Sequence, residues 1–546
     1  MSNPLMRIPK FALLVAALAA TLFAQNEAFF PKPQYFKTHF RTTPTRVELQ
    51  PPVRLNDFVV DGKLELSLKN ALDLAMSNNP DISFQKVSVE RQANAILRAF
   101  GPFDPFLQGS FNSTRQQTPS NTTLNGVTST LNQLTQPFSL TINQELETGT
   151  QYSIGYQNTK LSTNSSNATY NPSHSSNLLL GFTQPLIRGR GSFITRLPIT
   201  IARSNLRASQ YSLEDQIIQL VTSAELSYWA VIEARENVRV QEKSLELADI
   251  ALKRSKRELE LGAISSLEIF QPEANYANAQ IFLSQARYSL QQAENALRRQ
   301  IGADLDPQVR NLALSLTESP APPATPPQYD KEKLVEQALA RRPDLRSQVE
   351  TMVGDDLSIR LADNAMRPDL SLTGQYGSFG QGGTYYPPNS LIPVPGGFGD
   401  AFTQTFGFGF PTYGLGLRLR LPIKDRASAA NLADAVLSKK LDALREKSIV
   451  QNVRLQVLQA ISQVENSQAS VDLAKVARDL AQKRVDAEQK RYELGTTTIF
   501  FVLAAETDLT AAESTLVRES INYKRNLLQL SQRAGDLLDE RGIKIQ

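Results

Sequence analysis

The feature that most restricts the fold of this chain is a seven-residue apolar repeat between Arg445 and Leu494, interrupted only at Arg478. Neither proline nor glycine occurs in this stretch, so nothing in it breaks a helix. About fifty residues at roughly 1.5 Å each give a helix of roughly 75 Å, far longer than the helices of globular proteins. The repeat is carried by Val450, Val457, Val464, Val471, Val485 and Tyr492. It predicts a left-handed coiled coil.

The repeat resumes after a turn at Gly495. Apolar residues again recur at every seventh position, in the row Val502, Leu509, Leu516, Tyr523 and Leu530. Glycine favours the left-handed backbone conformation in which helices commonly end. Residues 428–533 are therefore predicted to form a helical hairpin with its tip at Leu494 and Gly495.

A second hairpin of this kind is predicted upstream, over residues 203–300. Its tip is Leu261 and Gly262, and its rising arm carries the row Ile217, Ala224, Val231, Val238, Leu245, Leu252 and Leu259. The two tip glycines lie 233 residues apart, and the same shift places Ile269 on Val502. This internal similarity predicts a duplicated chain in which each half contains the same elements.

Two segments between the helical regions change to a period of two residues. In residues 103–186 and 369–422, apolar side chains alternate with polar ones, as Phe138, Leu140 and Ile142 do with Ser139, Thr141 and Asn143. Such segments are typical of outer-membrane β-barrels, and a soluble β-sandwich with one wet face is the alternative. Arg418 and Arg420 occupy polar positions of the last strand. Because an arginine facing lipid costs roughly 2–4 kcal/mol, we expect both to face a water-filled lumen.

Six strands are predicted, four in the first of these segments and two in the second. Residues 113–136 and 159–176, which are rich in Asn, Ser and Thr, are predicted to be long loops between strands. The smallest membrane barrels have about eight strands, and an open sheet would leave unpaired edges in lipid. We therefore expect the chain to share a barrel with copies of itself. Between the last two strands, residues 378–411 are rich in glycine and aromatic side chains. They form either an aromatic cluster at the membrane interface or a loop folded into the pore.

The organisation of the whole chain follows from these elements. Arg7 and Lys10 precede the apolar run Phe11–Phe23, which indicates a secretory signal peptide, with an uncleaved anchor as the alternative. Each repeat is predicted to contain a helix, strands and a helical hairpin. In order, the predicted segments are a signal peptide (1–24), a proline-rich strap (25–63), a first repeat (64–302), a proline-rich linker (303–330), a second repeat (331–535) and a tail (536–546).

This duplicated plan, with the tip motifs Leu261-Gly262 and Arg491-Tyr492-Glu493-Leu494-Gly495-Thr496, resembles the TolC-like outer-membrane efflux channel family. The resemblance implies an α+β membrane protein: a homotrimeric outer-membrane β-barrel continued by a long periplasmic α-helical coiled-coil barrel. It implies a periplasmic adaptor and an inner-membrane pump as partners, and outer-membrane lipid around the barrel. Family members usually have four strands per protomer. The extra pair at Pro137–Asn158 then implies eighteen strands in the trimer, or a hairpin outside the wall.

The resemblance also assigns functional positions in this sequence. The adaptor would meet the hairpin tips, at Leu261, Gly262, Leu494, Gly495 and Thr496. An acid is expected six residues after each tip glycine, at the closed periplasmic entrance, and these positions hold Glu268 and Phe501. Ala504 replaces a further expected acid. The acidic entrance that the resemblance implies is therefore present in the first repeat only. The alternative role for Glu268 is that of a solvated charge near a helix N-terminus.

Composition excludes several other functions. A net charge of +4 does not indicate nucleic-acid binding, and the absence of cysteine rules out disulfides and thiolate–metal sites. The two histidines lie in polar segments, and no phosphate loop, nucleophile elbow or zinc motif occurs. We therefore expect no enzymatic activity, no cofactor and no metal.

The expected function is that of the outer-membrane channel of a tripartite efflux or type I secretion system. A stand-alone diffusion porin and a periplasmic coiled-coil scaffold are the alternatives. A porin does not need the long hairpins, and a scaffold does not need six amphipathic strands. The sequence does not indicate the transported substrate.

Overall fold

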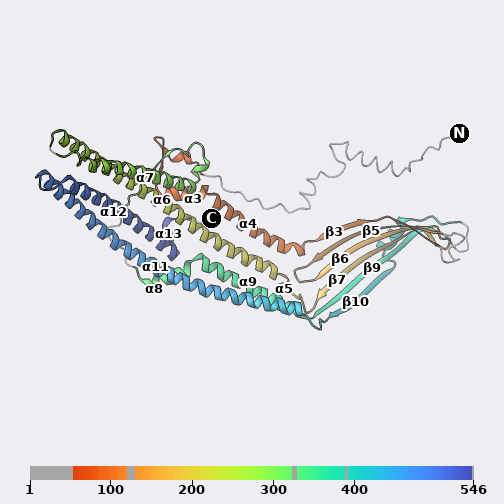
Figure 1. Ribbon diagram of the computed structural model, residues 1–546. Helices are drawn as coiled ribbons and strands as arrows, with labels where there is room; N and C mark the ends of the chain where they lie inside the picture. Colours follow the sequence, from red (N-terminus) through yellow and green to blue (C-terminus); the bar gives the residue numbers. More distant parts are fainter. Residues whose placement is uncertain (1–52, 120–129, 263, 322–328, 388–391, 544–546) are drawn as a thin grey trace, which may run out of the picture. The chain divides into compact units, whose positions relative to one another are not determined.

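The computed structural model of the protein describes residues 53–119, 130–262, 264–321, 329–387 and 392–543. The predicted signal peptide and the first part of the predicted strap lie outside these residues. The described chain contains long helices, a large antiparallel sheet and a small second sheet (Figure 1). Among the described residues, no helix is both long and apolar enough to cross a membrane.

Both helical hairpins are present. In the first, α6 (Leu197–Glu260) packs against α7 (Phe270–Gln300), and in the second, α11 (Arg426–Glu493) packs against α12 (Ile499–Ala534) (Figure 1). Helix α11 has 68 residues, which corresponds to a length of about 100 Å. The heptad positions pack the two arms together, in a buried cluster that includes Val457, Val464, Val471, Tyr523 and Leu530.

Each repeat begins with two shorter helices separated at a proline. These are α3 (Leu68–Asn78) and α4 (Pro80–Phe100) in the first repeat, and α8 (Lys331–Arg341) and α9 (Pro343–Ala365) in the second. Each proline stands in the first turn of its helix, where its missing N–H removes no hydrogen bond. Helix α4 packs along α6, and α9 packs against both α6 and α11.

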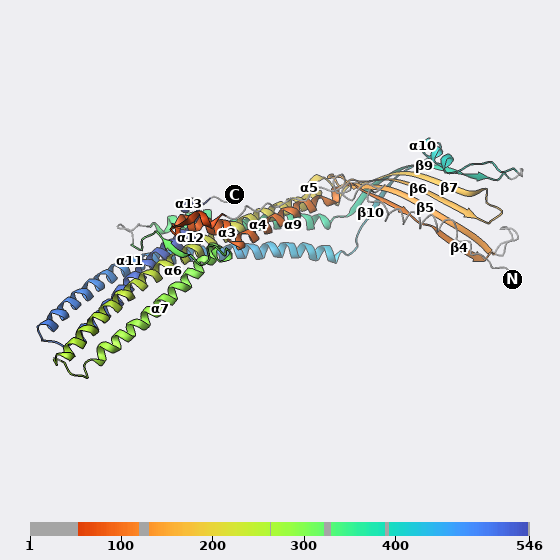
Figure 2. The ribbon, with the colours of Figure 1, turned by 90° about the horizontal axis from the view of Figure 1, so that it is seen from above.

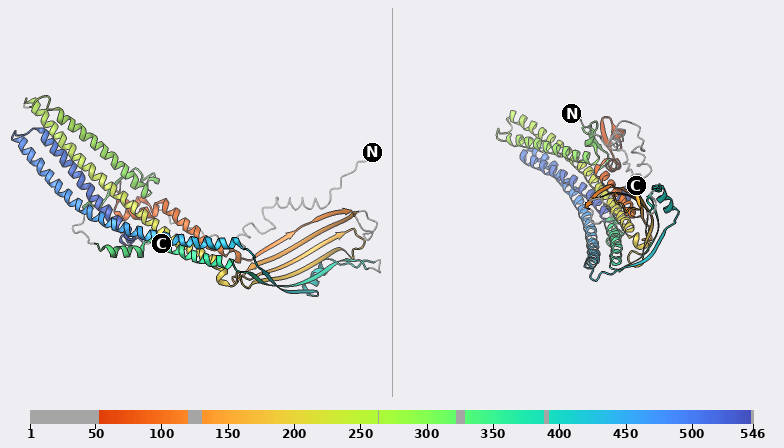
Figure 3. Two further views of the ribbon diagram at one scale, coloured as in Figure 1. Left: turned by 60° about the horizontal axis from the view of Figure 1, so that its bottom comes forward. Right: turned by 90° about the vertical axis from the view of Figure 1, so that its right-hand side faces the viewer.

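The large sheet is six strands wide. Its order is β10-β9-β7-β6-β5-β3, and β4 pairs with β5 beyond the end of β3, so that β3 and β4 together form one edge. The strands are β3 (Phe106–Phe111), β4 (Thr114–Pro119), β5 (Thr130–Glu145), β6 (Gln151–Thr163), β7 (Tyr170–Pro185), β9 (Asp369–Tyr385) and β10 (Pro411–Arg420). The predicted extra pair therefore lies inside the sheet, between β3 and β7. The sheet is curved (Figure 3).

The two faces of the sheet differ in polarity. Directly paired residues share a face, so the register assigns every side chain to one side. The apolar face carries exposed side chains that include Leu140, Ile142, Ile154, Leu180, Phe182, Tyr376, Tyr413, Leu415, Leu417 and Leu419. The opposite face carries Thr141, Gln157, Thr183, Gln375 and Arg418. Exposed apolar rows over a whole face are what lipid contact requires.

The strands are longer than their alternation predicts. Residues 113–136 and 159–176 are expected to be loops, but β4, the start of β5, the end of β6 and the start of β7 lie within them. This part of the prediction is wrong. Backbone pairing between the strands continues beyond the apolar rows. In these extensions both faces of the sheet are polar, so the sequence shows no alternation that would reveal a strand.

A small sheet joins the start of the described chain to the segment between the repeats. In it, β2 (Lys63–Leu66) pairs with β1 (Val59–Val60) and, in parallel, with β8 (Ala313–Leu316). The segment predicted as a linker thus contains a strand. Leu66 and Leu314 enter the main core of the helices, together with Trp229 and Leu537.

Candidate functional site

The tips of the two hairpins have the same backbone geometry. Gly262 and Gly495 have φ angles of +70° and +71°. The N–H of Gly495 donates to the carbonyl of Tyr492, and the N–H of Thr496 donates to that of Arg491, both at 2.9 Å, which closes a Schellman turn. A Cβ added at either glycine would meet no atom within 4 Å. The backbone conformation, and not packing within the chain, therefore requires glycine here.

The tip residues predicted to dock the adaptor lie on the surface. The side chains of Leu261 and Leu494 are 77% and 78% exposed. Thr496 is also exposed, and its hydroxyl donates to the carbonyl of Arg491 at 2.9 Å. Two leucines this exposed, at corresponding places in both repeats, are available for contact with a partner.

The residues assigned to the entrance follow each tip. Glu268 is exposed in the turn before α7, where its N–H donates to the carbonyl of Ser265 at 3.0 Å. Phe501 lies in the first turn of α12, is 50% exposed and has its ring centroid 5.5 Å from that of Phe500. Ala504 is half-buried one turn further on. The structure thus brings Phe501 and Ala504 together on α12, while Glu268 belongs to the other hairpin.

A polar contact near the tips joins the two hairpins. The hydroxyl of Tyr492, on α11, donates to Glu258, on α6. Arg254 pairs with Glu258 at 3.0 Å and lies 4.6 Å above the Tyr492 ring. Burial, and then the hydrogen bond to Glu258, raise the pKa of Tyr492 to about 12, so its hydroxyl remains a donor at neutral pH. The sequence places Tyr492 in a heptad row but gives no sign of its partner 234 positions away.

Two ion pairs hold the hairpins together further from the tips. Lys243 pairs with Glu513 at 3.0 Å, and Arg525 pairs with Glu233 at 2.7 Å, in both cases between α6 and α12. The second pair is only about a quarter exposed. Partly buried pairs are less screened by salt than surface pairs, so this contact fixes the position of one hairpin on the other.

A groove of about 510 Å³ lies where α6, α7 and α12 meet. Its lining is largely polar and includes Asn237, Gln241, Asn275, Asn278, Glu506 and Thr510. Burial raises the pKa of Glu506 from its ordinary value, opposed by a hydrogen bond from Gln489. The groove lies between the two hairpins, and its lining also includes apolar side chains such as Phe282 and Leu503.

Arg418 and Arg420 lie on the polar face of the sheet, as predicted from alternation. In the register of β10 and β9, Arg418 is opposite Ser371 and Arg420 is opposite Asp369. Both arginines are exposed. Their assignment to the inner surface of a pore depends on closure of the sheet into a barrel.

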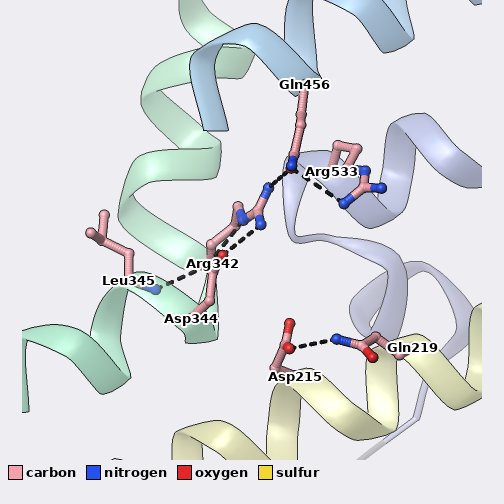
Figure 4. A network of polar contacts seen from close by, with 7 residues as sticks. All are labelled: Asp215, Gln219, Arg342, Asp344, Leu345, Gln456 and Arg533. Atoms are coloured by element: carbon pink, nitrogen blue, oxygen red, sulfur yellow. Dashed lines mark hydrogen bonds and ion pairs between the residues drawn. The ribbon is translucent and has the colours of Figure 1, made fainter. Parts of the chain in front are cut away.

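A polar junction connects the helices where the second repeat begins. Arg342 donates to Asp344 and to Gln456, and Arg533 donates to the same Gln456 oxygen at 3.2 Å (Figure 4). Asp215 lies nearby on α6, and burial, followed by the charge of Asp344, raises its pKa. Hydrogen bonds through Gln456 thus link α11 and α12 to Arg342 at the proline break before α9, while Asp215 of α6 interacts with this junction through charge.

A pair of carboxylates between α9 and α11 predicts a pH-dependent stability. Burial, and then the negative charge of Asp442, raise the pKa of Asp355 to about 6, while Lys439 opposes the shift. Asp442 is also paired with Arg445 at 2.8 Å. The folded protein binds an extra proton between about pH 4 and 6, so the free energy of unfolding falls as the pH rises through this range.

Replacing Asp355 by asparagine is expected to remove this fall in the free energy of unfolding with rising pH. The variant should be more stable than wild type by about 1 kcal/mol at pH 7.5, a value reduced for partial exposure, and equal to it below pH 4. Thermal unfolding followed by circular dichroism at the two pH values measures the difference. Asp356→Asn, which removes the ion pair with Lys439, is the matched control and should not stabilise. Equal stability of Asp355→Asn and wild type at pH 7.5 would contradict the account.

The fold, the exposed tips and the amphipathic sheet define a class of protein. The sequence model of the outer membrane efflux protein family matches residues 149–303 and 334–536. The chain belongs to this family, and the resemblance to TolC-like efflux channels is confirmed. The protein is accordingly an outer-membrane protein of efflux transport.

Individual relatives agree with this assignment. Outer membrane efflux protein BepC of Brucella suis is 22% identical over 474 residues, which cover 85% of each chain. Pyoverdine export outer membrane protein OpmQ of Pseudomonas aeruginosa is 23% identical over 326 residues, 58% of this chain and 61% of the relative. The outer membrane channel CmeC of Campylobacter jejuni superimposes with a TM-score of 0.63 at 17% identity, over 91% of both chains. CmeC therefore shares the fold.

Proposed function

We propose that three copies of this chain form an outer-membrane channel whose sheets close into one β-barrel of eighteen strands. The observation that carries the proposal is a sheet that is six strands wide, apolar on one face, and open at β10 and at β3 in the described part of the chain. In lipid, unpaired backbone groups at such edges cost several kcal/mol each. Pairing β10 of one copy with β3 of the next satisfies both edges and generates a closed ring.

In this assembly the helical hairpins of three copies surround a periplasmic tunnel. The exposed leucines at both tips support docking of a periplasmic adaptor, which connects the tunnel to an inner-membrane pump. The channel then conducts the substrates of the pump to the exterior, in a tripartite efflux or type I secretion system. The relative OpmQ is named for pyoverdine export, which favours an export duct over a diffusion porin.

The size and the partners of the extracted protein test this proposal. Detergent-extracted protein is expected to have three times the mass of one processed chain. Because the chain has no cysteine, Leu494→Cys places a single cross-linking site at a tip, and it should capture the adaptor in native cells. A stable monomeric pore would overturn the shared barrel. A trimer whose tips capture no protein would indicate the porin instead.

The entrance gives a separate expectation for conductance. In a threefold assembly, Phe501 and Glu268 form a ring of phenyl groups and a ring of carboxylates near the tips. Apolar rings close narrow pores by excluding water, and carboxylate rings favour cations. Phe501→Ser is therefore expected to raise the resting single-channel conductance several-fold, and Glu268→Gln to reduce the preference for cations without opening the pore.

The neighbouring phenylalanine is the control for this measurement. Phe500 is as exposed as Phe501 but lies one position earlier, about 100° around α12. Phe500→Ser should leave the conductance close to that of wild type. Wild-type conductance in Phe501→Ser, or equal effects of both substitutions, would exclude Phe501 as the closing ring.

A further inference from the structure

Helix α10 (Phe398–Phe406) lies directly against the large sheet (Figure 2). It forms within residues 378–411, the aromatic segment for which the sequence offers two locations, the membrane interface or the pore. Ala401 and Thr405, one turn apart, are fully buried, and the Thr405 hydroxyl donates to the carbonyl of Ala401. The side chain of Gln404 accepts a hydrogen bond from the N–H of Gln381, on β9, at 3.1 Å. The helix is therefore fixed to the strands, not suspended in a loop.

Two glycines of β9 form the seat of this helix. A Cβ at Gly380 would lie 2.1 Å from the carbonyl oxygen of Ala401, and one at Gly382 would lie 2.2 Å from that of Gly397. Both distances are far below van der Waals contact. Any larger residue at these positions would push α10 away from the sheet.

The same two glycines show which face of the sheet α10 covers. In the ladders, Gly380 is opposite Ser176, and Ser176 is opposite Asn158. Two residues along β6 from Asn158, on the same face, Tyr156 places its ring 5.9 Å from that of Phe402. Two residues further, the same face carries Ile154. Helix α10 therefore lies on the apolar face.

One side of α10, next to its buried face, carries a stripe of three phenylalanines. Phe398, Phe402 and Phe406 follow at intervals of four residues, with ring centroids 5.8 and 4.4 Å apart. Each ring is still 41–45% exposed. Tyr156, on β6, contacts the stripe, so the stripe points away from the β10 edge at which a neighbouring copy would join.

The position along the strand sets the depth of α10. From Asp369, where β9 begins shortly after α9, to Gly380 is eleven residues. At ~3.3 Å per residue and a tilt of about 40°, this corresponds to about 28 Å along the membrane normal. The apolar band of an outer-membrane barrel is about 25 Å tall and ends in aromatic girdles. Helix α10 thus lies at the outer end of the band.

We propose that α10 is an interfacial helix whose phenylalanine stripe binds the acyl chains of the outer-leaflet lipid. The glycine seat keeps the helix close to the wall, and the three rings extend the apolar surface of the sheet sideways into the leaflet. Three copies would supply part of the outer aromatic girdle as helices instead of strand residues. This inference requires that the sheet lies in the membrane, but it does not depend on the adaptor or the pump.

Fluorescence quenching by brominated lipid tests the proposal. Phe402→Trp is incorporated into vesicles of phosphatidylcholine brominated on its acyl chains, with the single native tryptophan, the buried Trp229, as a constant background. The added signal should be quenched at least half as strongly as that of Ile154→Trp, on the apolar face. The control Gln157→Trp, on the polar face, should be quenched by aqueous acrylamide and not by the lipid.

Two other outcomes would overturn the inference. Quenching of Phe402→Trp by acrylamide alone would place α10 in the aqueous pore, and protection from both quenchers would show that protein covers the stripe. In a second variant, Gly380→Ala is combined with Phe402→Trp. The added methyl group should displace α10 and reduce lipid quenching at least two-fold, and unchanged quenching would exclude the glycine seat.

Discussion

Replacing Gly495 by glutamate is expected to reduce export to background while trimers still reach the outer membrane. Glycine at this position has a φ of +71°, so another residue strains the turn by about 1 kcal/mol, too little to unfold the hairpin. No atom lies within 4 Å of the added Cβ, so the new side chain projects from the tip. A charged group there obstructs a partner that must approach the exposed leucines closely.

Survival on a compound that the native pump expels, with trimer levels measured in parallel, gives the result. Gly62→Glu is the matched control, because Gly62 has a φ of +74° and equally open surroundings but lies far from the tips in the small sheet region. Gly262→Glu tests the first tip in the same way. Export at wild-type level in Gly495→Glu would argue against docking at the tips.

Placing arginine at Ile154 is expected to lower the amount of assembled trimer in the outer membrane at least tenfold. Ile154 is the fourth residue of β6, in the extra hairpin, and faces the apolar side, where it is paired with Ile142 and Leu180. Arginine on the lipid face near mid-membrane costs roughly 2–4 kcal/mol, and a trimer incurs this cost three times. The amount of heat-modifiable trimer in isolated outer membranes measures the effect.

Gln157→Arg serves as the control on the same strand. Gln157 is on the polar face, where an arginine remains in water, so assembly should be normal. Deleting residues 138–157, the centre of the β5–β6 hairpin, should also prevent assembly, since it removes the partners of β3 and β7. If Ile154→Arg assembles as well as Gln157→Arg, the hairpin lies outside the wall and the barrel has four strands per copy.

The helical hairpins are predictable from this sequence because one periodic signal extends over many turns. The helices begin at Leu197 and Arg426, a few residues before the expected bounds. Each helix extends toward the N-terminus beyond the first residue of its apolar row, where the sequence carries no periodic signal. The six-strand width is equally visible, because alternating runs such as Phe138 to Asn143 are apolar on one face only. In both cases a repeated local pattern is enough to identify the element.

Other features depend on contacts that leave no periodic signal. Helix α10 is only nine residues long and is held by glycines of a distant strand. The partner of Tyr492 comes from the other repeat, and strand β8 has four residues in a segment rich in proline. The outer extensions of the strands are polar on both faces, so only backbone pairing reveals them. Periodic sequence patterns reflect which side chains are buried. The elements named here are instead determined by contacts and backbone pairing with segments far away in the sequence.

The core of the helices has a consequence for how the chain matures. Leu55 and Leu64 near one end of the described chain are buried in the same cluster as Leu537 and Leu538 near the other. Arg541 closes this cluster with two hydrogen bonds to the buried carboxylate of Glu225. A chain that emerges into the periplasm from its N-terminus cannot complete this core until Leu537, Leu538 and Arg541 have arrived. Until then the amphipathic hairpins and strands lack part of their core, so we expect biogenesis to require periplasmic chaperones that hold the nascent protein soluble.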